Sequence, residues 1–180
     1  MITRETEGRA MAYVQVYTGD GKGKTTAALG LLLRATGAGL SARVFQFLKQ
    51  GEYSELSALR ARFPEVAVTQ LGSGRFVFPP IPQDEIDRAK AGLALAREAV
   101  ASGDYDLIIL DEINGALSLG LIPIEDVLAM LAARHARTEL VLTGRGAPDA
   151  LIAAADLVTE MRCHKHYYEA GVPARTGIEL

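Results

Sequence analysis

The sequence predicts one α/β domain whose mostly parallel sheet is covered by helices on both faces. The first observation behind this prediction is that short apolar segments alternate with longer amphipathic ones, as they do in parallel α/β proteins. The second is a Gly-rich turn that joins the first apolar segment to an apolar helical pattern. A length of 180 residues, 49% of them hydrophobic, is enough for one core without disulfides or a structural metal.

Six short apolar segments are expected to form the strands of this sheet. They cover residues 12–17, 42–48, 66–71, 105–111, 138–143 and 157–161. The segments are separated by connections long enough for crossovers, which is why the strands are expected to run parallel.

Three helices are expected between the strands. The first covers residues 27–36, directly after the Gly-rich turn. The second covers 83–102, where apolar residues recur every three or four positions, and Gly103 suits its end. The third covers 124–135 and begins after Pro123.

Two segments fall outside this pattern. Residues 1–11 are charged and lack the apolar core of a secretion signal, so they are expected to form a flexible N-terminal arm before a domain at 12–180. Residues 72–82 are rich in Gly and Pro and contain Phe76 and Phe78. An irregular segment of this length is typical of a functional or flexible loop.

Composition narrows the choice of partners and compartment. A net charge of −3 argues against a mainly electrostatic nucleic-acid binder. The longest apolar run of the first helix, 27–33, is broken by Arg34 and is too short to span a membrane. Cys163 is the single cysteine, which excludes an internal disulfide and favours a reducing, cytoplasmic compartment. We therefore expect no nucleic-acid partner and no membrane association.

The Gly-rich turn is the strongest functional motif of the chain. It reads Thr18-Gly19-Asp20-Gly21-Lys22-Gly23-Lys24-Thr25-Thr26. Its end matches the phosphate-loop pattern G-x-x-x-x-G-K-[ST], in which the lysine reaches the phosphates and the hydroxyl holds Mg²⁺. The first glycine comes one residue late, at Gly19, and Lys22 adds a further positive charge.

The turn is compatible with three kinds of structure. A dinucleotide-binding turn would need glycine where Lys24 stands, and a Gly-rich connection with incidental lysines is the plain structural alternative. The strand before the turn and the helix after it favour a triphosphate cradle, because its backbone N–H groups and the helix start attract anions. The sequence therefore predicts a phosphate-loop NTPase-like (RecA-like) single domain.

Two further strand ends carry residues suited to a nucleotide site. The apolar run 107–110 ends in Asp111 and Glu112, as does the acidic strand that accompanies many phosphate loops, although a strand can also simply end in charged residues. The run 140–143 ends in Gly144-Arg145-Gly146, and Arg145 is expected either at phosphate or as a solvated turn residue. Ligands of parallel sheets bind beyond the carboxyl ends of the strands, so these side chains are expected to meet Lys24.

Two weaker groups of candidates remain. Gln46 and Lys49 end the second predicted strand and are candidates for the same crevice, with a solvated Lys49 as the alternative. The segment Cys163-His164-Lys165-His166 has the residue types of a metal site. Because no second ligand cluster completes it, it is expected to place His166 or Lys165 near an anionic or polar ligand instead.

These motifs together resemble the phosphate-loop type of corrinoid adenosyltransferases, from about Tyr13 to Leu180. The resemblance is carried by ordered blocks that begin with the phosphate loop and continue with Gln46-Phe47 and Lys49, Leu110-Asp111-Glu112, Thr143-Gly144-Arg145-Gly146, Ala155 to Met161, Lys165-His166, Ala170-Gly171-Val172 and Ala174 to Glu179. The late first glycine of the loop is itself a feature of that family.

The resemblance implies transfer of the 5′-deoxyadenosyl group of ATP to the cobalt of a reduced corrinoid, either cob(I)alamin or cob(I)yrinic acid a,c-diamide, with release of inorganic triphosphate. It implies catalytic roles for Lys24, Thr25 and Glu112. Mg²⁺, or Mn²⁺, is expected at Thr25 and Glu112, with Asp111 beside them. The expected ATP-binding residues are Gly19, Asp20, Gly21, Lys22, Gly23, Lys24, Thr25, Thr26, Arg34 and Arg145.

The resemblance also implies partners. Family members carry a Phe-x-Trp segment at the corrinoid, and this chain has Phe76 and Phe78 there but no tryptophan. Phe76 and Phe78 are the expected corrinoid-binding residues, with aromatic anchors of the core as the alternative. A homodimer and an electron-donating flavoprotein reductase are expected as well. The competing functions are a kinase or NTPase that moves the γ-phosphoryl group and a corrinoid carrier without turnover.

Overall fold

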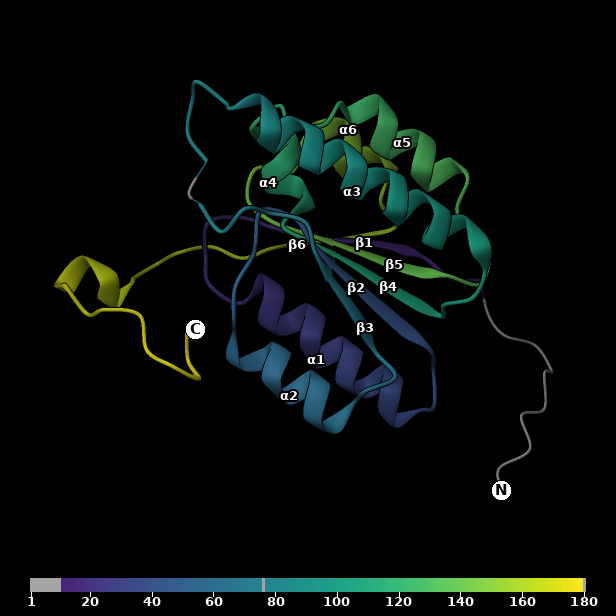
Figure 1. Ribbon diagram of the computed structural model, residues 1–180, viewed down its shortest axis with the longest axis horizontal. Helices are drawn as coiled ribbons and strands as arrows, with labels where there is room; N and C mark the ends of the chain where they lie inside the picture. The colour runs from purple at the N-terminus through teal and green to yellow at the C-terminus, as the bar shows by residue number, and fades with distance from the viewer. Residues whose placement is uncertain (1–10, 76, 180) are drawn as a thin grey trace.

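The computed structural model describes residues 11–75 and 77–179 and contains a six-stranded, fully parallel sheet (Figure 1). The strand order is β3-β2-β4-β5-β1-β6. All six predicted strands are confirmed, with small shifts at their ends. Their bounds are β1 Val14–Thr18, β2 Ala42–Gln46, β3 Ala67–Gln70, β4 Leu107–Asp111, β5 Glu139–Thr143 and β6 Leu157–Glu160.

Helices cover both faces of the sheet, as the alternating pattern predicts. Figure 1 shows α1 and α2 on one face and α3 to α6 on the other. The helices are α1 Lys24–Gly37, α2 Ser54–Arg62, α3 Gln83–Ser102, α4 Ile113–Ser118, α5 Ile124–Ala132 and α6 Asp149–Ala154, and a 3₁₀ turn follows at Tyr167–Ala170.

The core consists of two apolar layers, one on each side of the sheet. All five residues of β4 are buried, because β4 lies between β2 and β5 and has helices on both sides. Ile108 and Leu110 belong to the layer under α3 and α5, whereas Leu107 and Ile109 belong to the layer under α1. The alternation follows from the two-residue period of a strand.

The helix α3 forms where the apolar spacing predicts it. Ala89, Leu93, Ala96 and Val100 are buried along one stripe. Acidic residues occupy the first turn, and Gly103 ends the helix with a left-handed φ of 75°.

Three helices are not visible in the sequence pattern. Only Leu56 and Leu59 of α2 are buried, so its apolar stripe is too thin to recognise. The helices α4 and α6 have six residues each, less than two turns, and their stability comes from packing on the sheet rather than from a repeating pattern.

The structure describes most of the predicted loop at 72–82 but little of the predicted N-terminal arm at 1–11. The described residues of 72–82 adopt neither helix nor strand, as predicted. The predicted arm lies outside the described residues except for Met11, which is exposed. No helix within residues 11–75 and 77–179 is long and apolar enough to cross a membrane.

Candidate functional site

The phosphate loop joins the end of β1 to the start of α1, and its geometry explains the late first glycine. Thr18 is the last residue of β1 and pairs in register with Glu160 of β6. The backbone turns only at Gly19, with φ 93°, and a Cβ there would lie 2.4 Å from the carbonyl oxygen of Met161. A side chain is therefore excluded at position 19 both by backbone conformation and by space.

The segment after β6 supports the same loop. The backbone N–H of Gly21 donates to the carbonyl oxygen of Met161 at 2.7 Å. A Cβ at Gly21 would lie 2.8 Å from that oxygen and from backbone atoms of Arg162. The loop is thus fixed against the chain that leaves β6, at the carboxyl end of the sheet.

Lys24 lies across the loop at the first position of α1. Its Nζ donates to the carbonyl oxygens of Gly19 at 2.7 Å and Gly21 at 2.8 Å. Burial lowers the pKa of Lys24, and the carboxylate of Glu112 opposes this shift. The ammonium group therefore sits where the loop amides and the α1 dipole also favour an anion.

Asp111 links four elements at the end of β4. Its Oδ1 accepts hydrogen bonds from the hydroxyls of Thr25 at 2.8 Å and Thr143 at 2.6 Å. Its Oδ2 accepts from Nζ of Lys49 at 2.7 Å, and the side chain is 1% exposed. Asp111 therefore positions Thr25 from behind and is not itself among the residues that line the pocket described below.

Of the two weaker candidates at the end of the second strand, Lys49 lines the pocket described below, whereas Gln46 is buried beside Asp111 and does not line it. Nε2 of Gln46 lies 3.4 Å from Oδ2 of Asp111. Burial opposes the charge of Lys49, but the Asp111 carboxylate outweighs it, and the pKa of Lys49 is raised. Lys49 also follows Leu48, whose φ of 60° is rare for a residue with a side chain.

Glu112 has a similar backbone conformation at the end of β4. Its φ is 62°, and its backbone N–H donates to the hydroxyl of Thr143 at 3.1 Å. Burial, followed by the neighbouring Asp111, raises the pKa of the Glu112 carboxyl, while Lys49, Lys24 and Arg145 oppose the shift. Strained backbone at such a position is common in functional sites, and a nearby cation would stabilise this carboxylate.

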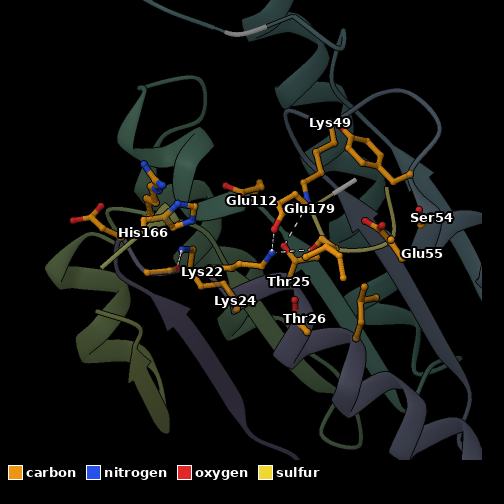
Figure 2. Close-up of a pocket in the computed structure, with 18 of the residues that line it drawn as sticks. Lys22, Lys24, Thr25, Thr26, Lys49, Ser54, Glu55, Glu112, His166 and Glu179 are labelled. Carbon is orange, nitrogen blue, oxygen red and sulfur yellow. Dashed lines mark hydrogen bonds and ion pairs between the residues drawn. The ribbon is translucent and has the colours of Figure 1, made fainter. Parts of the chain in front are cut away.

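The residues present fit the Mg²⁺ that the resemblance implies. The Thr25 hydroxyl and the Glu112 carboxylate are hard oxygen donors on the same pocket (Figure 2). Within the described part of the chain, no group of three or more His, Cys, Asp or Glu residues is placed to hold a metal ion. A sparse protein ligand set is typical of Mg²⁺, which keeps several waters and takes further oxygens from substrate phosphates.

These residues surround a pocket of about 690 Å³, which we call the nucleotide-sized pocket (Figure 2). The phosphate loop forms its floor, and Glu112 and Arg145 come from the ends of β4 and β5. The other walls come from the start of α2 and from residues near the end of the chain. The lining residues are Asp20 to Thr26, Leu29, Lys49, Tyr53, Ser54, Glu55, Ala58, Glu112, Arg145, His166 and Gly177 to Glu179.

The wall near the end of the chain was not predicted as part of the site. Nζ of Lys22 donates to Oε1 of Glu179 at 2.8 Å and to the carbonyl oxygen of Ile178 at 2.9 Å. The Glu179 carboxylate also accepts hydrogen bonds from Arg175 and from the hydroxyl of Tyr167. Arg175, then Lys22 and Tyr167, hold the pKa of Glu179 well below its usual range. Sequence spacing carries no signal for a contact over this separation.

The remaining candidates do not share one place in the structure. Arg34 is exposed on α1, ten residues or about 15 Å beyond Lys24, and does not line the pocket. Phe76 lies outside the described residues. Phe78 is 71% exposed and borders a different, smaller pocket. His166 lines the nucleotide-sized pocket, whereas Cys163 is an exposed free thiol.

A solved structure supports the fold. The flagellar accessory protein FlaH from Methanocaldococcus jannaschii matches with a TM-score of 0.60 over 86% of this chain and 73% of that chain. Its sequence is 13% identical, so this likeness concerns the fold alone.

Sequence relatives define the family. The "Corrinoid adenosyltransferase" of Pseudomonas aeruginosa is 40% identical over 92% of this chain and 82% of its own length. "Corrinoid adenosyltransferase CobA" of Salmonella typhimurium is 34% identical over 91% of this chain and 83% of its own length. The family model "ATP:corrinoid adenosyltransferase BtuR/CobO/CobP" matches residues 10–180. The chain therefore belongs to the ATP:corrinoid adenosyltransferase family.

Proposed function

We propose that this adenosyltransferase uses its phosphate loop to hold the leaving group of the reaction. The electron pair of Co(I) attacks the 5′ carbon of ATP, the cobalt–carbon bond forms, and the bond from that carbon to the phosphate oxygen breaks. The electron pair of the broken bond leaves on inorganic triphosphate. No general base is required, because Co(I) supplies its own electron pair.

The observation that carries this proposal is the set of positive charges that line the pocket. Lys22, Lys24 and Arg145 line it together with the start of α1. Charge that grows on a departing triphosphate is stabilised by such prearranged groups. The amides from Gly19 to Thr25 are expected to contribute in the same way.

Mg²⁺ is the proposed metal, held by Thr25 and Glu112 with Asp111 behind Thr25. When bound, it supplies neutralising charge to the triphosphate. Glu112 would contribute a carboxylate oxygen, and Asp111 accepts the hydrogen bond that fixes the Thr25 hydroxyl beside it.

The acceptor is proposed to approach along the 72–82 loop. Phe76 and Phe78 are the aromatic residues proposed to contact the corrinoid, and the exposed ring of Phe78 supports this assignment. The proposed acceptors are cob(I)alamin and cob(I)yrinic acid a,c-diamide. A flavoprotein reductase is the proposed source of the electron that converts Co(II) to Co(I).

A homodimer in the cytoplasm is proposed as the working form. The edge strand β6 supports this proposal, because all four of its residues are exposed, including Leu157 and Val158. Its outer edge has no strand partner within the described residues. A second copy is the proposed cover. The exposed thiol of Cys163 agrees with a reducing compartment.

The competing proposal is a kinase or NTPase that transfers or hydrolyses the γ-phosphate. The phosphate loop followed by an acidic strand end favours it, because both groups also serve that chemistry. Product analysis with ATP, Mg²⁺ and cob(I)alamin separates the two. Adenosylated corrinoid and inorganic triphosphate in equal amounts are expected, whereas ADP and phosphate would reject transfer from the 5′ carbon.

A further inference from the structure

A second pocket, of about 210 Å³, lies between the 72–82 loop and the first turn of α3. Its lining residues are Arg75, Val77, Phe78, Pro82 and Glu85, and we call it the Glu85 pocket. None of these residues lines the nucleotide-sized pocket.

The Glu85 pocket lies at the same end of the sheet as the phosphate loop. Figure 1 shows the β3–α3 connection at the end of the sheet from which α1 also starts. The backbone N–H of Gly72 donates to the carbonyl oxygen of Lys49 at 3.1 Å, and Lys49 lines the larger pocket. A molecule that contacts Phe78 is thus on the side of the protein where the nucleotide is expected.

Glu85 is the unusual residue of this pocket. It is only 4% exposed, and its Oε1 has no hydrogen-bond partner among residues 11–75 and 77–179. The guanidinium of Arg75 comes to 3.7 Å, beyond hydrogen-bond distance. Unsatisfied buried polar atoms are rare and costly, so a carboxylate left in this state indicates an acceptor kept for a ligand.

The charges around the pocket favour a donor over an anion. Arg75 is paired with Asp84 at 2.8 Å, and Glu85 adds a second carboxylate. One positive and two negative charges leave the cluster net negative. This net negative charge would repel a ligand carboxylate. The N–H groups of a neutral amide, in contrast, can donate hydrogen bonds to the Glu85 carboxylate.

The remaining walls are apolar. Val77, Phe78 and Pro82 line the pocket together with Glu85, and Phe78 is 71% exposed. The matching ligand has a broad apolar body and a short arm that ends in a primary amide. A corrinoid has this chemistry, because its ring edge carries acetamide and propionamide arms or the corresponding acids.

We propose that the Glu85 pocket receives one peripheral amide arm of the corrinoid, whose N–H groups donate to the Glu85 carboxylate while the macrocycle lies against Phe78. The chain then selects corrinoids that are amidated at that arm over those that carry a free acid there. This inference rests on the proposed function, since it names the substrate class of the same reaction.

Equilibrium dialysis without turnover tests the selection. Cob(II)inamide, which carries an amide at every arm, and cob(II)yrinic acid, which carries a free acid at every arm, are dialysed against the ATP-bound protein, and bound corrinoid is read from its absorbance. The wild type is expected to bind cobinamide about tenfold more tightly, the size of one hydrogen bond to a charged group. Equal affinities would overturn the proposal.

Two variants are expected to change the ratio of the two corrinoid affinities in opposite directions. Glu85→Gln keeps the shape of the side chain and removes its charge, so the affinity ratio should fall toward one. Arg75→Ala removes the only cation of the cluster from an exposed position, so the ratio should rise by about threefold. Glu98→Gln, the same change at an exposed position of α3, should leave the ratio as in the wild type. An unchanged ratio in both Glu85→Gln and Arg75→Ala would overturn the assignment.

These experiments distinguish failure of the Glu85 pocket proposal from failure of the proposed function. Normal turnover to triphosphate with unselective corrinoid binding would retain the adenosyltransfer mechanism and reject the Glu85 pocket. Failure of the wild type to bind either corrinoid would reject both. ATP affinity, measured in each variant, reports whether the fold is intact.

Discussion

Nζ of Lys22, inside the phosphate loop, lies 2.8 Å from Oε1 of Glu179, 157 residues later in the chain. The Glu179 carboxylate thus forms an ion pair with a loop ammonium group that a triphosphate would also contact. Binding of a polyanion therefore competes with Glu179, both for Lys22 and through like-charge repulsion.

The first prediction concerns this competition. Glu179→Gln is expected to tighten the binding of inorganic triphosphate by about two- to fivefold, a modest change because the pair is partly exposed to solvent. Calorimetric titration with triphosphate measures it. Glu169→Gln, an exposed change in the same segment, serves as the control and should have no effect. Weaker triphosphate binding by Glu179→Gln would instead show that the carboxylate holds the pocket wall in place.

The second prediction concerns Lys24. Lys24→Ala should reduce adenosyl transfer by at least about a hundredfold, because a prearranged positive charge at the leaving group is lost. The thermal melt should change little, since within the described part of the chain the hydrogen bonds of Nζ go to two carbonyl oxygens of the loop. Lys90→Ala, on the exposed side of α3, is the matched control. Near-normal rates in Lys24→Ala would remove the loop lysine from the mechanism.

The third prediction concerns the proposed metal site. Burial and Asp111 raise the pKa of Glu112, so its ionised form is disfavoured in the folded protein. Glu112→Gln removes that charge and should leave the melting temperature unchanged or slightly higher. Turnover should fall by about a hundredfold and lose its dependence on Mg²⁺ concentration. A normal Mg²⁺ titration curve in this variant would exclude Glu112 as a ligand.

The variant Asp111→Asn provides a contrast with Glu112→Gln. Asp111 is buried and accepts hydrogen bonds from Thr25, Thr143 and Lys49. Its neutralisation leaves the Lys49 ammonium without its partner and should cost about 3 kcal/mol of unfolding free energy. Denaturant titration of both variants therefore separates a positioning carboxylate from a proposed ligand.

Features encoded by neighbouring residues could be predicted from the sequence, whereas contacts between distant residues could not. The strands and the phosphate loop are encoded by neighbouring residues, so their places follow from spacing alone. The pairing of Lys22 with Glu179 depends on how the chain returns after β6, and no local pattern records it. The sequence does not predict the helix α2 for a related reason, since two buried leucines give no recognisable stripe. Asp111 and Glu112 are adjacent in sequence, yet only the structure distinguishes the enclosed carboxylate from the one facing the pocket.

The fourth prediction concerns the late glycine of the loop. Gly19→Ala forces a side chain into a backbone with φ 93° and against the Met161 carbonyl oxygen at 2.4 Å. The variant should lose about 2 to 4 kcal/mol of unfolding free energy and bind ATP more weakly. Gly30→Ala is the control, because nothing lies within 4 Å of its added Cβ in the middle of α1. That change should stabilise the protein by up to about 1 kcal/mol. Equal stability of the two variants would contradict the clash.

The fifth prediction concerns the proposed corrinoid contact of Phe78. Its ring is 71% exposed, so Phe78→Ala removes little buried area and should leave the melting temperature and the Kd for ATP unchanged. The KM for the corrinoid should rise by about tenfold, because an aromatic anchor at a binding surface is lost. Tyr168→Ala, at a residue that is 75% exposed, controls for the loss of a surface aromatic. Since Phe78 borders the Glu85 pocket and not the nucleotide-sized one, the two substrates should respond separately. A parallel loss of ATP and corrinoid affinity would show that Phe78 serves the fold rather than the acceptor.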